Sequence, residues 1–147
     1  MNYYAAPMEG LTDRVWRQAH QKWFGLAGNA DRYYAPFLSP PENRVLIKKK
    51  MAELAPAANP GAPVIPQLLA KDGELAAWMI GELRGLGYTE VNLNLGCPSG
   101  TVTAKGKGSG MLRFSCRRIC QCGRADLGQD PAGRGKAGRI CCHSGHL

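Results

Sequence analysis

The sequence predicts an α/β fold that contains the first four strands of a (β/α)8 TIM barrel, followed by a C-terminal tail without regular structure. Short apolar segments with the period-two pattern of strands alternate with longer segments that have the helical period of 3.6. Strands that alternate with helices of this length are typical of parallel βαβ units. A complete barrel normally needs about 250 residues. The chain has 147, so four strands would form half of one.

The first two predicted strands are separated by a predicted helix. Residues 2–6 predict the first strand, and residues 31–37 predict the second. Between them, Thr12 can cap a helix that runs to Phe24, because its hydroxyl can accept a hydrogen bond from a free backbone N–H. The apolar spacing predicts an inner face made of Val15, Trp16, Ala19, His20 and Trp23. His20 is therefore expected to be a stacked or solvent-edge residue rather than a ligand.

The next elements repeat this order. A helix over about residues 44–54 contains the Lys48-Lys49-Lys50 run, which we interpret as a solvated face, with phosphate contact as the alternative. Residues 63–69 predict the third strand. Residues 72–86 predict a third helix, which Gly87 is well placed to end. The inner face of this helix is predicted to contain Leu75, Met79, Ile80, Leu83 and Leu86.

The fourth predicted strand, residues 89–95, has one apolar face and one amide face, because side chains alternate along a strand. The apolar face consists of Val91, Leu93 and Leu95. In a parallel barrel that face packs on helices, so Asn92 and Asn94 are expected to point into the barrel. Asn94 lies near the carboxyl end of the strand, where barrel enzymes have their active sites.

The loop after this strand presents a cysteine and is the best candidate for chemistry. Gly96 has no side chain, so a flat ligand could approach the backbone closely. Pro98 disfavours the helical conformation for Cys97, which is therefore expected to be extended. On spacing alone, Cys97 could equally be a small buried hydrophobic residue.

Four motifs, in this order, resemble those of the tRNA-dihydrouridine synthases. They are Ala6-Pro7-Met8-Glu9-Gly10-Leu11-Thr12-Asp13, Pro66-Gln67-Leu68, Asn94-Leu95-Gly96-Cys97-Pro98 and Gly108-Ser109-Gly110-Met111-Leu112. The order and separation of the motifs make the resemblance specific over residues 1–112, the amino-terminal half of such an enzyme. The Pro-Ser-Gly-Thr-Val continuation after Cys97 is similar to the bacterial branch.

The resemblance implies an enzyme that binds FMN, takes reducing equivalents from NADPH and reduces the C5–C6 bond of a uridine in tRNA. By motif match, Cys97 is the catalytic general acid that protonates C5, and Asn94 binds near the uracil. Pro7, Met8 and Glu9 match the loop that lies against the flavin, and Gln67 matches an amide that hydrogen-bonds the flavin ring. Ala35-Pro36-Phe37 departs from the pattern, since many relatives carry a Glu-Phe pair there.

A glycine-rich segment over residues 105–110 fails both nucleotide-loop patterns. The phosphate-loop pattern needs Ser or Thr after its lysine, but Lys107 is followed by Gly108. We interpret the segment as a mobile basic loop, with contact to the RNA backbone as the alternative.

The composition changes abruptly after residue 112. Of the six cysteines, five lie in residues 113–147, together with 7 of the 19 basic and 2 of the 11 acidic residues. The tail therefore carries +5 of the net +8 charge. It has neither a sustained apolar period nor enough large aliphatic residues for a core. We interpret residues 113–147 as an aberrant basic tail, read out of frame and without fixed structure.

The alternative for the tail is a zinc or RNA-binding module. Its candidate ligands are Cys116, Cys120, Cys122, Cys141, Cys142, His143 and His146. The spacing of Cys116 and Cys120 fits a structural zinc site loosely, but that of His143 and His146 is too short. We therefore predict no metal.

Taken together, these patterns define three hypotheses. The first is a truncated flavin-dependent tRNA reductase that is inactive alone, because relatives use a lysine, a histidine and a phosphate-binding loop from the second half of the barrel. The second is the zinc or RNA-binding module. The third is another FMN barrel oxidoreductase, similar to dihydroorotate or dihydropyrimidine dehydrogenases. No apolar run approaches the ~18 residues of a membrane span, so we expect a cytoplasmic protein with tRNA as its partner and no stable protein partner.

Overall fold

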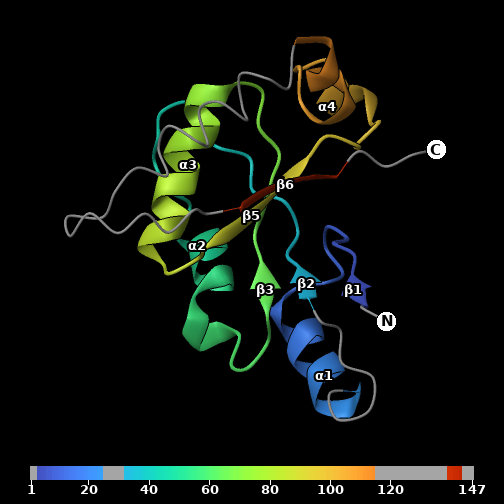
Figure 1. Ribbon diagram of the computed structural model, residues 1–147, viewed down its shortest axis with the longest axis vertical. Coiled ribbons are helices and arrows are strands. Elements are labelled where there is room, and N and C mark those ends of the chain that lie inside the picture. Colours follow the sequence, from blue (N-terminus) through green and yellow to red (C-terminus); the bar gives the residue numbers. More distant parts are fainter. Residues whose placement is uncertain (1–2, 25–31, 115–138, 144–147) are drawn as a thin grey trace.

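The computed structural model describes residues 3–24 and 32–114 and the backbone of residues 139–143. Short parallel strands alternate with helices along these residues (Figure 1). The elements in chain order are β1 Tyr4–Ala5, α1 Arg14–Phe24, β2 Arg32–Tyr34, α2 Lys48–Leu54, η1 Pro56–Ala58, β3 Val64–Ile65, β4 Gln67–Leu68, α3 Gly73–Gly85, β5 Glu90–Asn94, α4 Gly100–Thr103, η2 Gly108–Phe114 and β6 Arg139–His143, where η marks a 3-10 helix.

The strands pair in sequence order and are all parallel, as in an open section of a barrel. One sheet has the order β1-β2-β3 and the other β4-β5-β6. A parallel bridge between Leu38 and Leu68 links the chain after β2 to β4. The predicted α/β architecture and parallel order are confirmed. Within the described residues, the strands do not close into a barrel.

Two predicted strands are interrupted by prolines. The single strand predicted over residues 63–69 is divided into β3 and β4 by Pro66, which has no N–H to donate to a ladder. The second predicted strand, residues 31–37, is described as a strand only over β2. Its pairing continues through the Ala35 N–H bond to the Ile65 carbonyl at 2.9 Å, and Pro36 follows.

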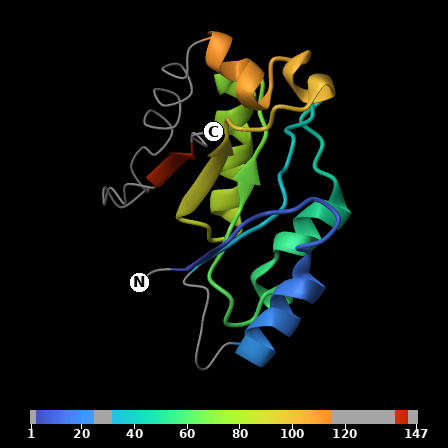
Figure 2. The same ribbon diagram turned by 90° about the vertical axis from the view of Figure 1, so that its right-hand side faces the viewer.

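The core lies between the sheet and the helices α2 and α3, which flank the strands in Figures 1 and 2. Val91, Leu93 and Leu95 belong to this core, whereas Asn92 and Asn94 lie on the opposite face of β5. The predicted alternation of the fourth strand is therefore confirmed. The other buried members of the core are Ala35, Leu38, Leu54, Leu68, Ala70, Ala76, Met79, Ile80, Leu83 and Met111.

Helix α3 follows the sequence prediction closely. The Asp72 side chain accepts a hydrogen bond from the Leu75 N–H at 2.8 Å and caps the helix. Gly87, at φ +96°, ends it in the left-handed conformation that glycine adopts without strain. Of the predicted inner face, Met79, Ile80 and Leu83 are buried, and Leu75 and Leu86 are half-buried.

Helix α1 differs from its prediction in both cap and inner face. Asp13, rather than Thr12, caps the helix, since its carboxylate accepts from the Trp16 N–H at 2.9 Å. Val15 and Trp23, both predicted to face inward, are 62% and 76% exposed. The buried residue of the helix is Arg17, at 0% exposed. The inner face predicted from the apolar spacing is wrong because a polar network around Arg17 decides which side of α1 faces the protein.

The prediction for His20 is confirmed. Its ring stacks on Trp16, with ring centroids 4.8 Å apart, and its Nδ1 lies 2.9 Å from the Tyr33 hydroxyl. It is a half-buried helix residue that is satisfied by its neighbours.

Helix α2 begins at Lys48, four residues later than expected. Arg44 has φ +53°, which a right-handed helix does not allow, and its side chain is ion-paired with Glu74. Lys48 and Lys49 are exposed, as the solvated-face interpretation expects. Lys50 is half-buried, and its Nζ lies 3.7 Å from a Glu9 carboxylate oxygen.

The described part of the tail has regular structure, unlike the unstructured tail that we expected, since Arg113 and Phe114 belong to η2 and residues 139–143 form β6. β6 pairs in parallel with β5 along its whole length, from Glu90 with Arg139 to Asn94 with His143. A strand edge presents free N–H and C=O groups that attract a further strand. The zinc candidates Cys116, Cys120, Cys122 and His146 lie outside the described residues. None of the described helices is both long and apolar enough to cross a membrane.

Candidate active site

A cavity of about 350 Å³ opens at the carboxyl ends of β4 and β5. Its size lies within the range of small-molecule sites, and its position is the usual one for active sites in parallel barrels. Five of the six predicted site residues line it, namely Pro7, Glu9, Gln67, Asn94 and Cys97. The other lining residues are Pro36, Phe37, Asn92, Leu93 and Gly96.

Three amide side chains form a hydrogen-bonded row along the cavity. Asn94 Oδ1 accepts from the backbone N–H groups of Cys97 at 3.0 Å and Gly96 at 3.2 Å. Its Nδ2 therefore donates to Gln67 Oε1, at 3.0 Å. Gln67 Nε2 in turn donates to Asn92 Oδ1, at 2.8 Å. Because backbone N–H groups can only donate, they fix the orientation of every amide in the row.

The row leaves hydrogen-bonding capacity for a ligand. Among the described residues, the second N–H and second lone pair of Gln67 and the second N–H of Asn94 have no hydrogen-bond partner. A planar heterocycle whose edge alternates carbonyl and N–H groups, such as the flavin ring or uracil, matches these groups. The donor set and the cavity volume therefore fit the ring of FMN.

Cys97 lies beside the last amide of the row. The thiol is half-buried and lines the cavity, and its backbone N–H is held by Asn94. Within the described part of the chain it is a free cysteine. A thiol in this position can give a proton to a ring bound against Gln67 and Asn94.

Met8 does not line the cavity, unlike its neighbours Pro7 and Glu9. Its side chain is 51% exposed. Its backbone instead forms a tight turn with Thr12, whose hydroxyl accepts from the Met8 N–H at 2.8 Å and donates to the Met8 carbonyl at 3.3 Å. This turn sets the path of the loop that carries Pro7 and Glu9.

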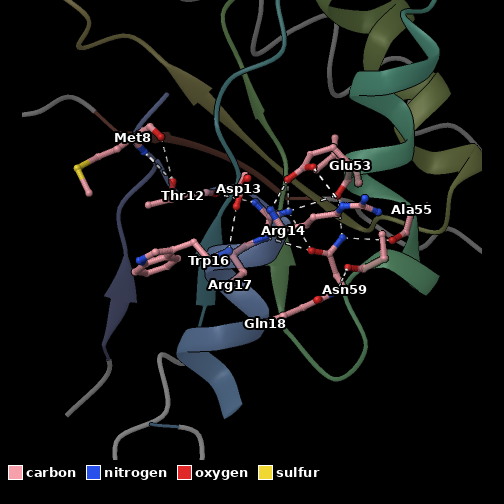
Figure 3. A network of polar contacts seen from close by, with 12 residues as sticks. Met8, Thr12, Asp13, Arg14, Trp16, Arg17, Gln18, Glu53, Ala55 and Asn59 are labelled. Atoms are coloured by element: carbon pink, nitrogen blue, oxygen red, sulfur yellow. Dashed lines mark hydrogen bonds and ion pairs between the residues drawn. The ribbon is translucent and has the colours of Figure 1, made fainter. Parts of the chain in front are cut away.

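Arg17 holds this turn against the rest of the protein (Figure 3). Its Nη1 donates to the Thr12 carbonyl at 2.9 Å, and its Nη2 lies 3.0 Å from Glu53 Oε1. Nε and Nη2 both donate to Asn59 Oδ1, at 3.1 and 2.9 Å. Burial lowers the pKa of Arg17, and the Glu53 carboxylate opposes that shift. Nothing in the local sequence distinguishes Arg17 from a surface arginine.

The glycine-rich segment over residues 105–110 is folded onto the site, so its interpretation as a mobile loop is wrong for the part that packs there. Gly108 and Gly110 are buried, and Lys107 Nζ donates to Ser39 Oγ at 3.0 Å. Burial lowers the pKa of Lys107, and the nearby Lys105 lowers it further. A Cβ on Gly108 would lie 2.6 Å from the Cys97 carbonyl oxygen, and Gly108 has φ +57°.

Gly108→Ala is expected to destabilise the protein by about 1–3 kcal/mol, because it adds both a steric overlap and a strained left-handed φ. Gly81 provides a matched control. It lies in α3, and a Cβ added there would meet nothing within 4 Å, so Gly81→Ala should be neutral or stabilising. Urea denaturation measures both, and equal free energies of unfolding for the two variants would contradict the packing described.

Comparison with known proteins assigns the chain to a family. A family model described as Dihydrouridine synthase (Dus) matches residues 4–125. The matched range contains every residue that lines the cavity, and it extends past residue 112, where the resemblance in the motifs ends. A search of curated proteins gave no match. Since the family model matches well over half of this chain, the chain belongs to the dihydrouridine synthase family.

Proposed function

We propose that this chain carries the uracil-reducing site of a flavin-dependent tRNA-dihydrouridine synthase. The family consists of oxidoreductases that generally act on uridine in tRNA and generally depend on FMN. The observation that carries the proposal is that Gln67, Asn94 and Cys97 share one cavity and are joined through hydrogen bonds. The amide proposed to bind the ring thus lies on β4, and the thiol proposed to donate the proton lies in the loop after the adjacent parallel strand β5.

Gln67 is the residue proposed to hold the flavin ring, with Pro7 and Glu9 on the facing loop. The backbone around Pro7 is fixed by the Thr12 turn and by Arg17, which lets the loop serve as one wall. When bound, FMN reduced by NADPH supplies a hydride to C6 of the uracil. The cavity residues restrict the orientation of the rings rather than taking part in hydride transfer.

Cys97 is proposed to give its proton to C5 of the uracil, which completes the reduction of the C5–C6 bond. Its backbone N–H is held by Asn94, so the thiol starts from a fixed position. A general acid needs this placement more than it needs extreme acidity. The uracil itself must leave its base stack to reach the cavity, as with other enzymes that act on a base.

The test is a single-turnover assay with the chain in excess over an unmodified tRNA transcript, in the presence of FMN and NADPH. Dihydrouridine should appear in the RNA, detected by mass spectrometry of nucleosides. Free uracil and orotate, whose C5–C6 bonds could accept the same hydride, should react at least tenfold more slowly. Turnover of the small molecules without turnover of RNA would overturn the proposal in favour of another FMN oxidoreductase.

Gln67→Leu is expected to weaken FMN binding about tenfold, since it removes one good hydrogen bond to the ring and breaks the contacts of Gln67 with Asn92 and Asn94. Titration of FMN fluorescence measures the dissociation constant. Gln18→Leu is the matched control, because Gln18 is exposed, donates to the Ala58 carbonyl at 2.8 Å and does not line the cavity. Equal FMN affinity of the two variants would remove Gln67 from the cofactor site.

We also infer from composition that the tail is read out of frame and takes no part in this chemistry. The change after residue 112 in charge and cysteine content supports this. The nucleotide sequence downstream of codon 112 tests it. A shifted frame that encodes further barrel elements would support the inference, and an open frame with no such continuation in any phase would contradict it.

A further inference from the structure

We propose that Ser109 is a positioning residue for Cys97. It lies twelve positions further along the chain, and it fixes the carbonyl side of the cysteine as Asn94 fixes the amide side. The contacts between Ser109 and Cys97 are observed in the structure. Their consequence for catalysis rests on the function proposed above.

Both hydrogen-bonding groups of Ser109 reach the same acceptor. Its backbone N–H and its hydroxyl each donate to the Cys97 carbonyl oxygen, at 3.1 Å. On the other side, the Cys97 N–H donates to Asn94 Oδ1 at 3.0 Å. The peptide groups before and after the Cys97 Cα are therefore both held. Because the Cα–Cβ direction follows from these two peptide planes, they determine where the thiol can point.

Two glycines allow Ser109 to approach this closely. A Cβ on Gly108 would lie 2.9 Å from the Cys97 Cβ as well as 2.6 Å from its carbonyl oxygen, and a Cβ on Gly110 would lie 2.6 Å from the Thr103 carbonyl oxygen. These distances are shorter than van der Waals contact. The close packing therefore requires glycine on either side of Ser109, and a need for mobility does not explain these residues.

The segment is anchored on its far side by the core. Met111 is 3% exposed and belongs to the core cluster with Leu93 and Leu95 of the fourth predicted strand. Ser109 thus connects the core to the Cys97 loop over a very short distance along the chain. A loop held in this way resists displacement when a ligand enters the cavity.

Loss of the hydroxyl should loosen Cys97 without unfolding the protein, because the backbone N–H of Ser109 keeps its bond to the same carbonyl. Ser109→Ala is therefore expected to raise the alkylation rate of the Cys97 thiol about fivefold, the scale of one lost neutral hydrogen bond. The rate is measured on the full chain with iodoacetamide and peptide-resolved mass spectrometry, which separates Cys97 from the other cysteines.

Two control variants separate positioning from general destabilisation. Ser99→Ala removes a hydroxyl from the same loop, but that hydroxyl contacts Thr101 rather than Cys97. Tyr88→Phe removes a half-buried hydroxyl that donates to the Leu54 carbonyl at 2.5 Å, away from the cavity. Both variants should leave the alkylation rate of Cys97 within twofold of wild type. This should hold even if their melting temperatures fall as much as that of Ser109→Ala.

An unchanged Cys97 rate in Ser109→Ala, or an equal increase in Tyr88→Phe, would overturn the proposal. In the single-turnover RNA assay, Ser109→Ala should lower the limiting rate constant about fivefold and leave the half-saturating chain concentration unchanged, whereas a role in RNA binding would raise that concentration. If wild type forms no dihydrouridine while the alkylation difference remains, the proposed function fails and the positioning role stands.

Discussion

Cys97→Ala is expected to lower dihydrouridine formation by ~10²-fold or more, the scale for loss of a general acid. The Cys97 thiol lines the cavity and pairs a transferable proton with a backbone position that Asn94 holds. The side chains that contact the flavin in our proposal, Gln67 and Pro7, are untouched by the change. FMN affinity and NADPH oxidation by the chain without RNA should therefore remain within twofold of wild type.

Two further variants make this prediction specific. Cys97→Ser keeps a hydroxyl at the site, but a hydroxyl is a much weaker acid than a thiol, so dihydrouridine formation should remain at least tenfold below wild type. Cys122→Ala removes a cysteine of the tail and should leave the rate unchanged. A Cys97→Ala variant that modifies uridine at the wild-type rate would show that another group supplies the proton.

Arg17→Met is expected to cost about 3 kcal/mol of folding stability. The substitution keeps the apolar length of the side chain but removes hydrogen bonds to Thr12, Glu53 and Asn59. Charged hydrogen bonds contribute about 1.5–3 kcal/mol each, and partners left buried add a desolvation cost. The Glu53 side chain is 30% exposed, so water can solvate part of its charge and limit the loss.

Arg14→Met is the matched control for this change. Arg14 lies one turn earlier on α1 and reaches the same Glu53, but its guanidinium is 4.0 Å away and its side chain is 52% exposed. Such surface pairs contribute about 0–1 kcal/mol. Urea denaturation should therefore separate the two variants by about 2 kcal/mol or more. Equal losses would mean that the buried network contributes no more than a surface ion pair.

Sequence reasoning succeeded where local chemistry decides the structure. The cap at Asp72 and the left-handed Gly87 bound α3, and strict alternation sets the faces of β5, so both elements lie where they were expected. It failed on α1, where Arg17 is buried because of partners that lie 36 and 42 positions further along the chain. Apolar periodicity contains no information on such long-range polar contacts.

The candidate site likewise has residues that the sequence identifies and contacts that only the fold reveals. Motif matches identified Pro7, Glu9, Gln67, Asn94 and Cys97, which the fold does bring to one cavity. Met8 matched the same motif, but its side chain lies outside the cavity lining because the Thr12 turn decides its direction. Ser109 belongs to the fourth motif, but nothing in that motif assigns it a role. Its proposed function depends on a contact with Cys97 that only the fold reveals.

The central claim is that the cavity beside Cys97 is where the flavin and the uracil meet. The most direct measurement is the alkylation rate of Cys97 at increasing FMN concentration, with peptide-resolved mass spectrometry. Our account predicts saturable protection of Cys97, with a half-point equal to the FMN dissociation constant and shifted about tenfold upward in Gln67→Leu. An alkylation rate of Cys97 that is unchanged when FMN is bound at saturation would contradict it.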